Sequence, residues 1–396
     1  MKKEVMFTSE SVTGGHPDKM CDQIADAVVD HFLVQDPYSR IRVECAVSSA
    51  ILFIAASFRS LANVDLAQVA RKVIKKIGYD GTDFNSQNCS ILTAPQAQAV
   101  KPQYRFEPHT LSDDEINRIS VKNQVTLFGF ACNQSESYMP LPIDLAHKLA
   151  RQLAEVRKKM VLPYLSPEGK VQVGIAYRGG RPTRIHSLTV TANQREEKRP
   201  SLRTVRGDIR EAVIDPVFAE TPLRLNRRTQ IHVNPDGVQL GGPTRHSGLS
   251  GKKNAIDTYG EYSRHSGKAL SGKDPLRIDR IGAYAARHAA KNVVAAEIAD
   301  QCEIMLSYSI GQTGPVSVQV QTAGTGRIPD EDIADMILRH FDFRLAGIIK
   351  AFDLQRLPAR HAGGFYEKLA AYGHFGRSDL ELPWEALDRV AALSGT

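Results

Sequence analysis

The sequence predicts an α+β protein made of three units, each a small sheet with helices. With 396 residues the chain is longer than one hydrophobic core usually serves, so two or three domains are expected. Hydrophobic residues make up 42% and charged residues 24%, ordinary values for a chain with a large buried core. Strand-like and helix-like segments recur as three groups, from which we expect domains over residues 1–101, 115–232 and 233–396.

The first unit is expected to start with a short strand followed by a helix. Pro17 suits the first turn of that helix, and apolar residues follow it at helical spacing. Residues 40–47 and 51–56 are predicted to form a hairpin, residues 65–77 a helix closed by Gly78, and residues 88–94 a strand. Residues 95–110 contain three prolines and show no period. They form either a disordered connector or an active-site lid, and we favour the lid.

The other two units show the same mixture of elements. In the second, strands are expected over residues 124–131, 170–177 and 184–192, a long helix over 142–160, and a helix near 202–214. A strand over 229–233 leads into a glycine-rich stretch. Beyond it we expect a helix over 279–298, strands over 304–310 and 316–321, and helices from about residues 330 and 343. No convincing sequence repeat relates the three units.

The charge, the apolar runs and the cysteines of the sequence indicate which partners and which cellular compartment to expect. The net charge of +7 suits a polyanionic partner, but no block of five like charges appears, which favours a local anion pocket over a nucleic-acid surface. No apolar run approaches ~20 residues, so no membrane span is expected. The N-terminal segment lacks an apolar signal core, which favours the cytoplasm. The five scattered cysteines are expected to be reduced, with neither zinc nor disulfides.

Residues 241–280 form the most informative stretch. It combines seven glycines and five serines with eight cations, a composition typical of an ordered loop. Cations along such a loop can converge on one polyanion, together with exposed backbone N–H groups. Asp274 and Asp279 add carboxylates of the kind that magnesium prefers. A solvated basic loop is an equally plausible interpretation from composition alone.

The motifs of this stretch, in their order, resemble those of the methionine adenosyltransferases (S-adenosylmethionine synthetases). They are GGP, GLSGKK, DTYG and SGKDPLRIDR. Further matches are FTSESVTGGHPDKMCDQIADAVVD (residues 7–30), FGFA (128–131), PEGKVQV (167–173), SYSIG (307–311) and YGHFGR (372–377). The resemblance covers nearly the whole chain. It implies three similar sheet-plus-helix domains related by a pseudo-threefold axis, and a homodimer or dimer of dimers with active sites at the subunit interface.

The resemblance also implies a reaction, in which methionine and ATP give S-adenosylmethionine, pyrophosphate and phosphate. A neutral thioether attacks C5′ of ATP, so the main catalytic demand is to stabilise the departing triphosphate with cations and magnesium. The implied catalytic residues are His16, Lys170, Lys252, Lys253, Lys273 and Arg277. Asp18 and Asp279 would bind magnesium, two ions being expected, and Glu44 would help to bind potassium. The implied substrate-binding positions are Glu168, Ser57, Asn123, Arg245, His246 and Gln98.

The departures from the family pattern are concentrated in the part of the site that binds the acceptor and the adenine. Asn123, His246 and Ser57 stand where the family has acidic residues, and Lys252 stands where it usually has arginine. The aromatic residue that stacks on adenine falls near Val238, where this chain is one residue shorter. An ammonium group in a closed site needs an anionic partner, so these changes disfavour the amino end of methionine.

Three functions remain open at this stage. The leading one is a methionine adenosyltransferase that requires magnesium. The second is a paralogue that keeps triphosphate departure but adenosylates another, more anionic acceptor. The third is a non-catalytic regulatory subunit, which the retained lysines disfavour because a silent subunit has little reason to keep a polyphosphate clamp.

Overall fold

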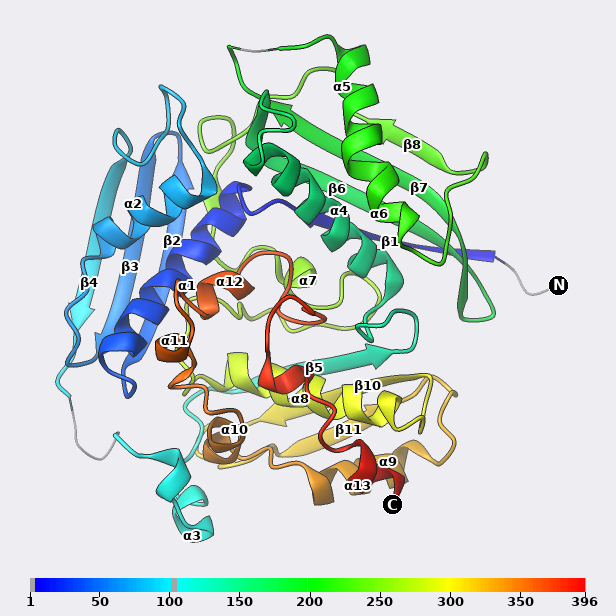
Figure 1. The fold of residues 1–396 in the computed structure, drawn as a ribbon. Coiled ribbons are helices and arrows are strands. Elements are labelled where there is room, and N and C mark those ends of the chain that lie inside the picture. Colours follow the sequence, from blue (N-terminus) through cyan, green and yellow to red (C-terminus); the bar gives the residue numbers. More distant parts are fainter. Residues whose placement is uncertain (1–3, 101–104, 198, 396) are drawn as a thin grey trace.

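The computed structural model describes residues 4–100, 105–197 and 199–395, which fold into three small sheets with a long helix on each (Figure 1). The strand orders are β1-β6-β7-β8, β4-β3-β2-β9 and β11-β10-β5. This is the α+β architecture of three sheet-plus-helix units that the sequence predicts. The strands are β1 (Glu4–Val12), β2 (Arg40–Ser48), β3 (Ile51–Arg59), β4 (Ser90–Ala97), β5 (Val125–Cys132), β6 (Leu165–Arg178), β7 (Arg181–Gln194), β8 (Gln230–Val233), β9 (Gly248–Leu249), β10 (Gln301–Tyr308) and β11 (Ser317–Gln321).

Three long helices cover the three sheets. Helix α1 (Pro17–Gln35) packs on β2, α4 (Leu141–Lys158) on β1 and β6, and α8 (Ile278–Ala295) on β5 and β10. The shorter α-helices are α2 (Leu66–Ile77), α3 (Asp113–Ile116), α5 (Leu202–Ile209), α6 (Asp215–Ala219), α7 (Asn254–Asp257), α9 (Asp330–His340), α10 (Leu345–Phe352), α11 (Leu357–Arg360), α12 (Tyr366–Leu369) and α13 (Val390–Ser394). Two 3₁₀ turns, η2 (Pro108–Thr110) and η4 (Pro383–Glu385), complete the description.

The three sheets share a pairing pattern even though the sequence shows no repeat. Each contains an antiparallel hairpin, formed by β2 and β3, β6 and β7, or β10 and β11. In each sheet a strand from a distant part of the chain pairs antiparallel with the first hairpin strand: β9 with β2, β1 with β6, and β5 with β10. Two of the sheets add a parallel strand, β4 or β8, beyond the hairpin. The units are therefore similar in topology, and each sheet joins separate stretches of sequence.

The buried apolar side chains form two clusters. The larger one surrounds α1 and α8 and the two sheets that they cover, with fully buried residues such as Phe32 and Trp384. The smaller one lies between α4 and the β6-β7 hairpin. Within it, Leu145, Leu149 and Leu153 face inward from α4, as their spacing predicts.

Several predicted elements differ in extent. The helix expected near residues 202–214 contains the π-helical turn η3 (Arg210–Ile214), which is followed by α6. Pro216 lies at the start of α6 and cannot donate a backbone hydrogen bond to the preceding turn, which explains the irregularity. Strand β4 extends to Ala97, into the segment expected to be a loop. Residues 101–104 of the predicted lid lie outside the described residues, so the lid remains a prediction.

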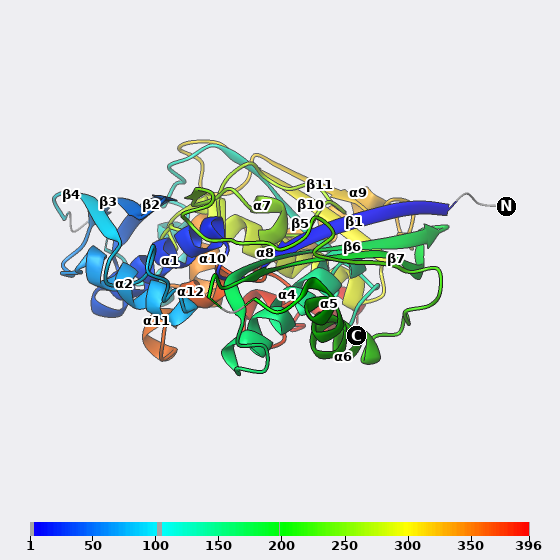
Figure 2. The same cartoon turned by 90° about the horizontal axis from the view of Figure 1, so that it is seen from above.

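None of the helices in the described part of the chain lies on one broad face of the β4-β3-β2-β9 sheet. Figure 2 shows α2 and α11 on the opposite side of these strands. Phe53, Leu92 and Leu249 are between 42% and 56% exposed there, and strand pairing places them in one row with Ala46. Among the described helices, none is both long and apolar enough to cross a lipid bilayer.

Candidate functional site

The site begins where the loop before α1 presses against β6. Thr13 donates from its backbone N–H to Gly169 and from its hydroxyl to the Pro167 carbonyl, at 3.0 and 2.7 Å. A Cβ atom on Gly15 would lie only 2.2 Å from the Pro167 carbonyl oxygen, so this close approach requires glycine. The turn therefore places His16 directly beside Glu168.

His16 begins helix α1 and is buried. Its Nδ1 accepts the backbone N–H of Asp18 at 3.2 Å, which caps the helix, and Pro17 occupies the first turn. Burial lowers the pKa of His16 to about 2, and Lys253 and Lys170 nearby add to the effect. The ring is neutral at physiological pH. Because its Nδ1 accepts a hydrogen bond, its proton is on Nε2, the atom that faces Glu168.

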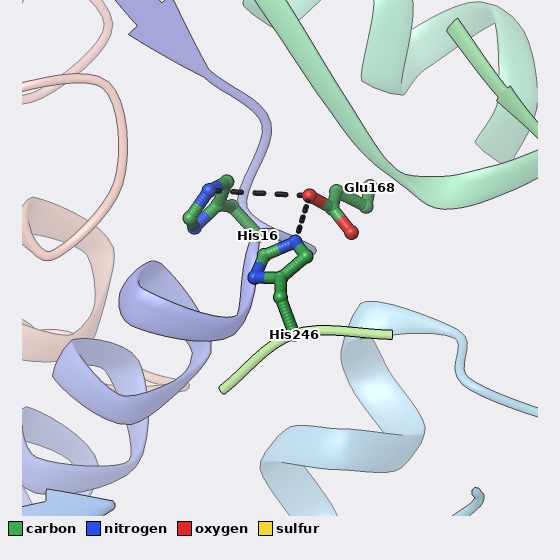
Figure 3. Close-up of side chains that lie close together, drawn as sticks. All are labelled: His16, Glu168 and His246. Atoms are coloured by element: carbon green, nitrogen blue, oxygen red, sulfur yellow. Dashed lines mark hydrogen bonds and ion pairs between the residues drawn. The ribbon is translucent and has the colours of Figure 1, made fainter. Parts of the chain in front are cut away.

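Figure 3 shows the three side chains that meet here: His16, Glu168 and His246. The Oε1 atom of Glu168 lies 2.6 Å from Nε2 of His246 and 3.9 Å from Nε2 of His16. The other oxygen of Glu168 accepts the backbone N–H of Gly242 at 2.5 Å. Two histidines and a carboxylate this close could in principle bind a metal ion. Nε2 of His16 carries the proton and so offers no lone pair to a metal; among the three side chains the hydrogen bond is the one between His246 and Glu168.

Cations surround this group. Lys170 Nζ lies 3.8 Å from Glu168 and Lys253 Nζ lies 3.6 Å from Glu10, while Lys252 and Arg245 are exposed on the same glycine-rich loop. Asp18 is buried, and its Oδ1 accepts the backbone N–H of Leu249 at 3.0 Å. We call this region the histidine end. It comprises His16, Asp18, Glu168, Lys170, Arg245, His246, Lys252 and Lys253.

An acidic face of α1 holds the glycine-rich stretch in place. Asp18, Asp22, Asp26 and Asp30 lie four residues apart, so they share one helix face. Asp22 accepts the backbone N–H of Gly251 at 2.7 Å, and Asp26 that of Gly272 at 2.8 Å. Asp30 does the same for the backbone N–H groups of residues 365–367. The sequence argument missed this role, although the D-x3-D spacing of residues 18–30 was visible.

Buried cations compensate two of these aspartates. Lys19 pairs with Asp22 at 2.8 Å and also contacts Asp257, while Arg280 pairs with Asp26 at 2.6 Å. All of these side chains are nearly inaccessible to solvent, and burial raises the pKa of Asp22 and Asp26 despite their partners. Removing one partner would leave a buried charge unpaired, which typically costs about 3–5 kcal/mol. The loop is thus anchored through its backbone, which leaves its other lysines for a ligand.

The remaining predicted site residues lie in a second region, which we call the cation end. Lys273 forms an isolated bridge with Arg42 on β2, and its Nζ lies 3.6 Å from Asp279 Oδ1. Asn123 donates to the same Asp279 oxygen at 2.8 Å. Burial lowers the pKa of Lys273 to about 8, although Asp279 opposes the shift. The region comprises Arg42, Glu44, Ser57, Gln98, Asn123, Lys273, Arg277 and Asp279.

The two ends do not meet within one chain. The cation end lies at the Arg42 level of β2, whereas β9 and the histidine end lie at the level of Ala46 and Val47. Between Arg42 and Val47 the strand advances about 16 Å at roughly 3.3 Å per residue. Asp18 and Asp279, the two predicted magnesium ligands, therefore belong to different ends. The structure places the predicted residues in two separate groups.

The three-sheet fold, with its loop cations and buried neutral histidine, has the features of an α+β anion-binding protein. Comparisons with known proteins define the family. Three family models match consecutive segments: "S-adenosylmethionine synthetase, N-terminal domain" at residues 4–100, the "central domain" at 118–239 and the "C-terminal domain" at 240–386. The chain therefore belongs to the S-adenosylmethionine synthetase family.

Curated relatives match over almost the full length. The S-adenosylmethionine synthase of Gloeothece citriformis (strain PCC 7424) is 45% identical, and the match covers 99% of this chain and 97% of the relative. That of Synechococcus sp. (strain JA-3-3Ab) is 46% identical, with 98% and 97% covered. That of Synechococcus elongatus (strain ATCC 33912 / PCC 7942 / FACHB-805) is 44% identical, with 99% and 98% covered.

Proposed function

We propose that this chain is an ATP-dependent adenosyltransferase that converts ATP, methionine and water into S-adenosylmethionine, pyrophosphate and phosphate, the water being consumed when the released triphosphate is hydrolysed. The observation that carries the proposal is the buried, neutral His16, whose Nε2–H donor lies among lysines of the glycine-rich loop and β6. A neutral donor beside cations suits a reaction in which a polyphosphate oxygen gains charge without taking a proton. The full-length relatives named S-adenosylmethionine synthase support the same reaction.

In the proposed step, a lone pair on the thioether sulfur forms the new bond to C5′ of ATP. The bond from C5′ to the bridging oxygen breaks, and its electron pair leaves with the triphosphate. No proton is transferred, so no general base is needed. His16 donates a hydrogen bond to the bridging oxygen, and with a pKa of about 2 it acts as a donor and not as an acid. The proposed phosphate ligands are Lys170, Lys252, Lys253, Lys273 and Arg277.

Two buried carboxylates fit the metal ions that such a reaction uses. Asp18 and Asp279 each present carboxylate oxygens, which are the ligands that magnesium bound to phosphates prefers. The cations around each carboxylate would bind the same phosphates. When bound, two magnesium ions would neutralise part of the triphosphate charge. Glu44 is the proposed potassium ligand. Its carboxylate is paired with Arg42, so potassium binding there requires this pair to open.

The remaining proposed substrate contacts come from both ends. We assign Glu168, Arg245 and His246 at the histidine end, and Ser57, Gln98 and Asn123 at the cation end. Asn123 already donates to Asp279, which positions that carboxylate. Glu168 is bound by His246 and by the Gly242 backbone, so it can orient the loop beside His16.

A homodimer would complete the site, and a dimer of dimers would keep the same arrangement. The two ends lie at opposite ends of the helix-free sheet face, and the row of Phe53, Leu92 and Leu249 lies at the level of Ala46, toward the histidine end. A two-fold axis that crosses β2 midway between Arg42 and Ala46 would bring the histidine end of one subunit to the cation end of the other. Exposed apolar side chains in one row are also what a subunit interface would bury.

The direct test is incubation with ATP, magnesium and methionine, with S-adenosylmethionine, pyrophosphate and phosphate measured separately. We expect the three products in equal amounts. Cleavage of triphosphate without a sulfonium product would contradict the proposed transfer, and no cleavage at all would favour a non-catalytic subunit. We also propose a cytoplasmic location, with which five free, buried cysteines are consistent.

A further inference from the structure

A small cavity lies at the cation end. It has a volume of about 180 Å³ and lies between the ends of β3 and β4 and the segment before α8. Phe58 and Leu276 form its apolar wall. Four cationic side chains also line it: Arg40, Arg59, Lys122 and Arg277.

Asp274 is the one carboxylate among the described residues that line the cavity, and both of its oxygens accept backbone hydrogen bonds. Asp274 is 1% exposed, and its two oxygens accept the N–H groups of Ile41 and Leu276 at 2.7 and 2.8 Å. Arg277 also lies 3.7 Å from it. Because Asp274 is almost completely buried and already binds two backbone N–H groups, it is not accessible to a cationic ligand group.

The neutral polar groups of the cavity are oriented as donors. Arg59 donates from Nε to Oε1 of Gln98 at 2.8 Å, which fixes the amide so that its NH₂ faces Ser57. Nε2 of Gln98 then donates to the Ser57 hydroxyl oxygen at 3.1 Å. With that oxygen accepting, the Ser57 proton is directed to another acceptor. The chain from Arg59 through Gln98 to Ser57 thus ends in an O–H donor.

We propose that this cavity binds a carboxylate of the acceptor, and that the α-ammonium group is not required. The inference rests on the proposed function and names its substrate class: thioether carboxylates, with or without an amine. Cations and an O–H donor bind a carboxylate through charge-assisted hydrogen bonds, whereas an ammonium group would find no available anion among the described lining residues. The apolar wall of Phe58 and Leu276 suits the methylene chain that leads to the sulfur.

The first test compares three acceptors at saturating ATP and magnesium. They are methionine, 4-(methylthio)butanoate, which lacks the amine, and methioninol, which keeps the amine but lacks the carboxylate. We expect kcat/KM for the butanoate to fall within about ten-fold of that for methionine, and that for methioninol to lie about ten- to hundred-fold lower. Conversion of methionine with an inert butanoate would overturn the inference and leave the proposed function intact. Failure of all three acceptors would refute the proposed function itself.

The second test uses Arg59→Met and Lys122→Met, which remove one cavity charge each. Both variants are expected to raise the KM for the butanoate about ten-fold, with KM for methioninol and for ATP within two-fold of the parent values. Lys159→Met, which removes an exposed charge near the end of α4, is the matched control and should change none of these constants. An increase confined to the KM for ATP would assign the cavity to the triphosphate and overturn the proposal.

Discussion

The two ends of the site differ in the way that each holds its charges. At the histidine end, a neutral His16 lies beside a buried Glu168 that is held by hydrogen bonds with His246 and the Gly242 backbone, and the backbone of the nearby loop is bound by aspartates of α1. At the cation end, burial lowers the pKa of Lys273 to about 8, and several of the nearby cations are partly exposed. The first end is preorganised, whereas the second depends on an anionic ligand to stabilise its positive charge.

This difference suggests that the two ends have different roles in the proposed reaction. A preorganised donor such as His16 gains most at the moment when charge develops on the leaving oxygen. Lys273 and Arg277 at the other end would hold the phosphates before and after that moment. We propose that catalysis needs one end from each of two subunits.

The largest expected effect comes from removing the buried cation. Lys273→Met keeps the apolar stem but removes the charge, and we expect turnover to fall on the order of 10²-fold or more, because a fixed cation on the departing triphosphate is lost. Steady-state kinetics with ATP and methionine measure this, with Lys159→Met as the exposed control. Near-normal turnover of Lys273→Met at saturating ATP would mean that the cation end does not hold the triphosphate.

The next largest effect concerns magnesium. Asp18→Asn and Asp279→Asn each keep an amide oxygen and lose a charged ligand, so each should raise the magnesium concentration needed for half-maximal activity about ten-fold or more. Asp236→Asn, in an exposed turn, is the matched control. If the magnesium titration were unchanged in both site variants, neither Asp18 nor Asp279 would be a magnesium ligand.

A smaller effect is expected when the pH is changed, and we attribute it to Lys273 of the cation end. Lys273, with a pKa of about 8, is charged below that pH and neutral above it, so kcat/KM for ATP should fall as pH rises through 8, by about ten-fold between pH 7 and pH 9. Bound triphosphate would favour the charged form, so kcat should fall only at higher pH. Lys273→Arg stays charged throughout this range and should lose the decline. A decline that persists in Lys273→Arg would assign it to another group.

The sequence predicted the long helices and most of the strands, but not how the candidate site residues are grouped. Helix α2 shows why single elements can be predicted from the sequence. Asp65 caps it and Gly78, with φ +97°, ends it, and both act through contacts within a few residues. The pairing of β9 with β2 or of β1 with β6 joins segments far apart in the chain, and no local pattern encodes it. For the same reason the separation of Asp18 from Asp279 was not foreseen. The cations Arg42, Arg59 and Lys122 were missed because they lie outside the motifs.

The most direct test of the central claim is a subunit-mixing experiment. His16→Asn keeps a helix-capping side chain but loses the ring donor, and Lys273→Met disables the other end. Each variant alone should be nearly inactive. After subunit exchange, about half of the dimers should be mixed, and each mixed dimer should hold one site with both ends intact. The account predicts recovery to about a quarter of the parent activity. No recovery, in a mixture where exchange is demonstrated by differently tagged subunits, would show that both ends act within one chain and would contradict the account.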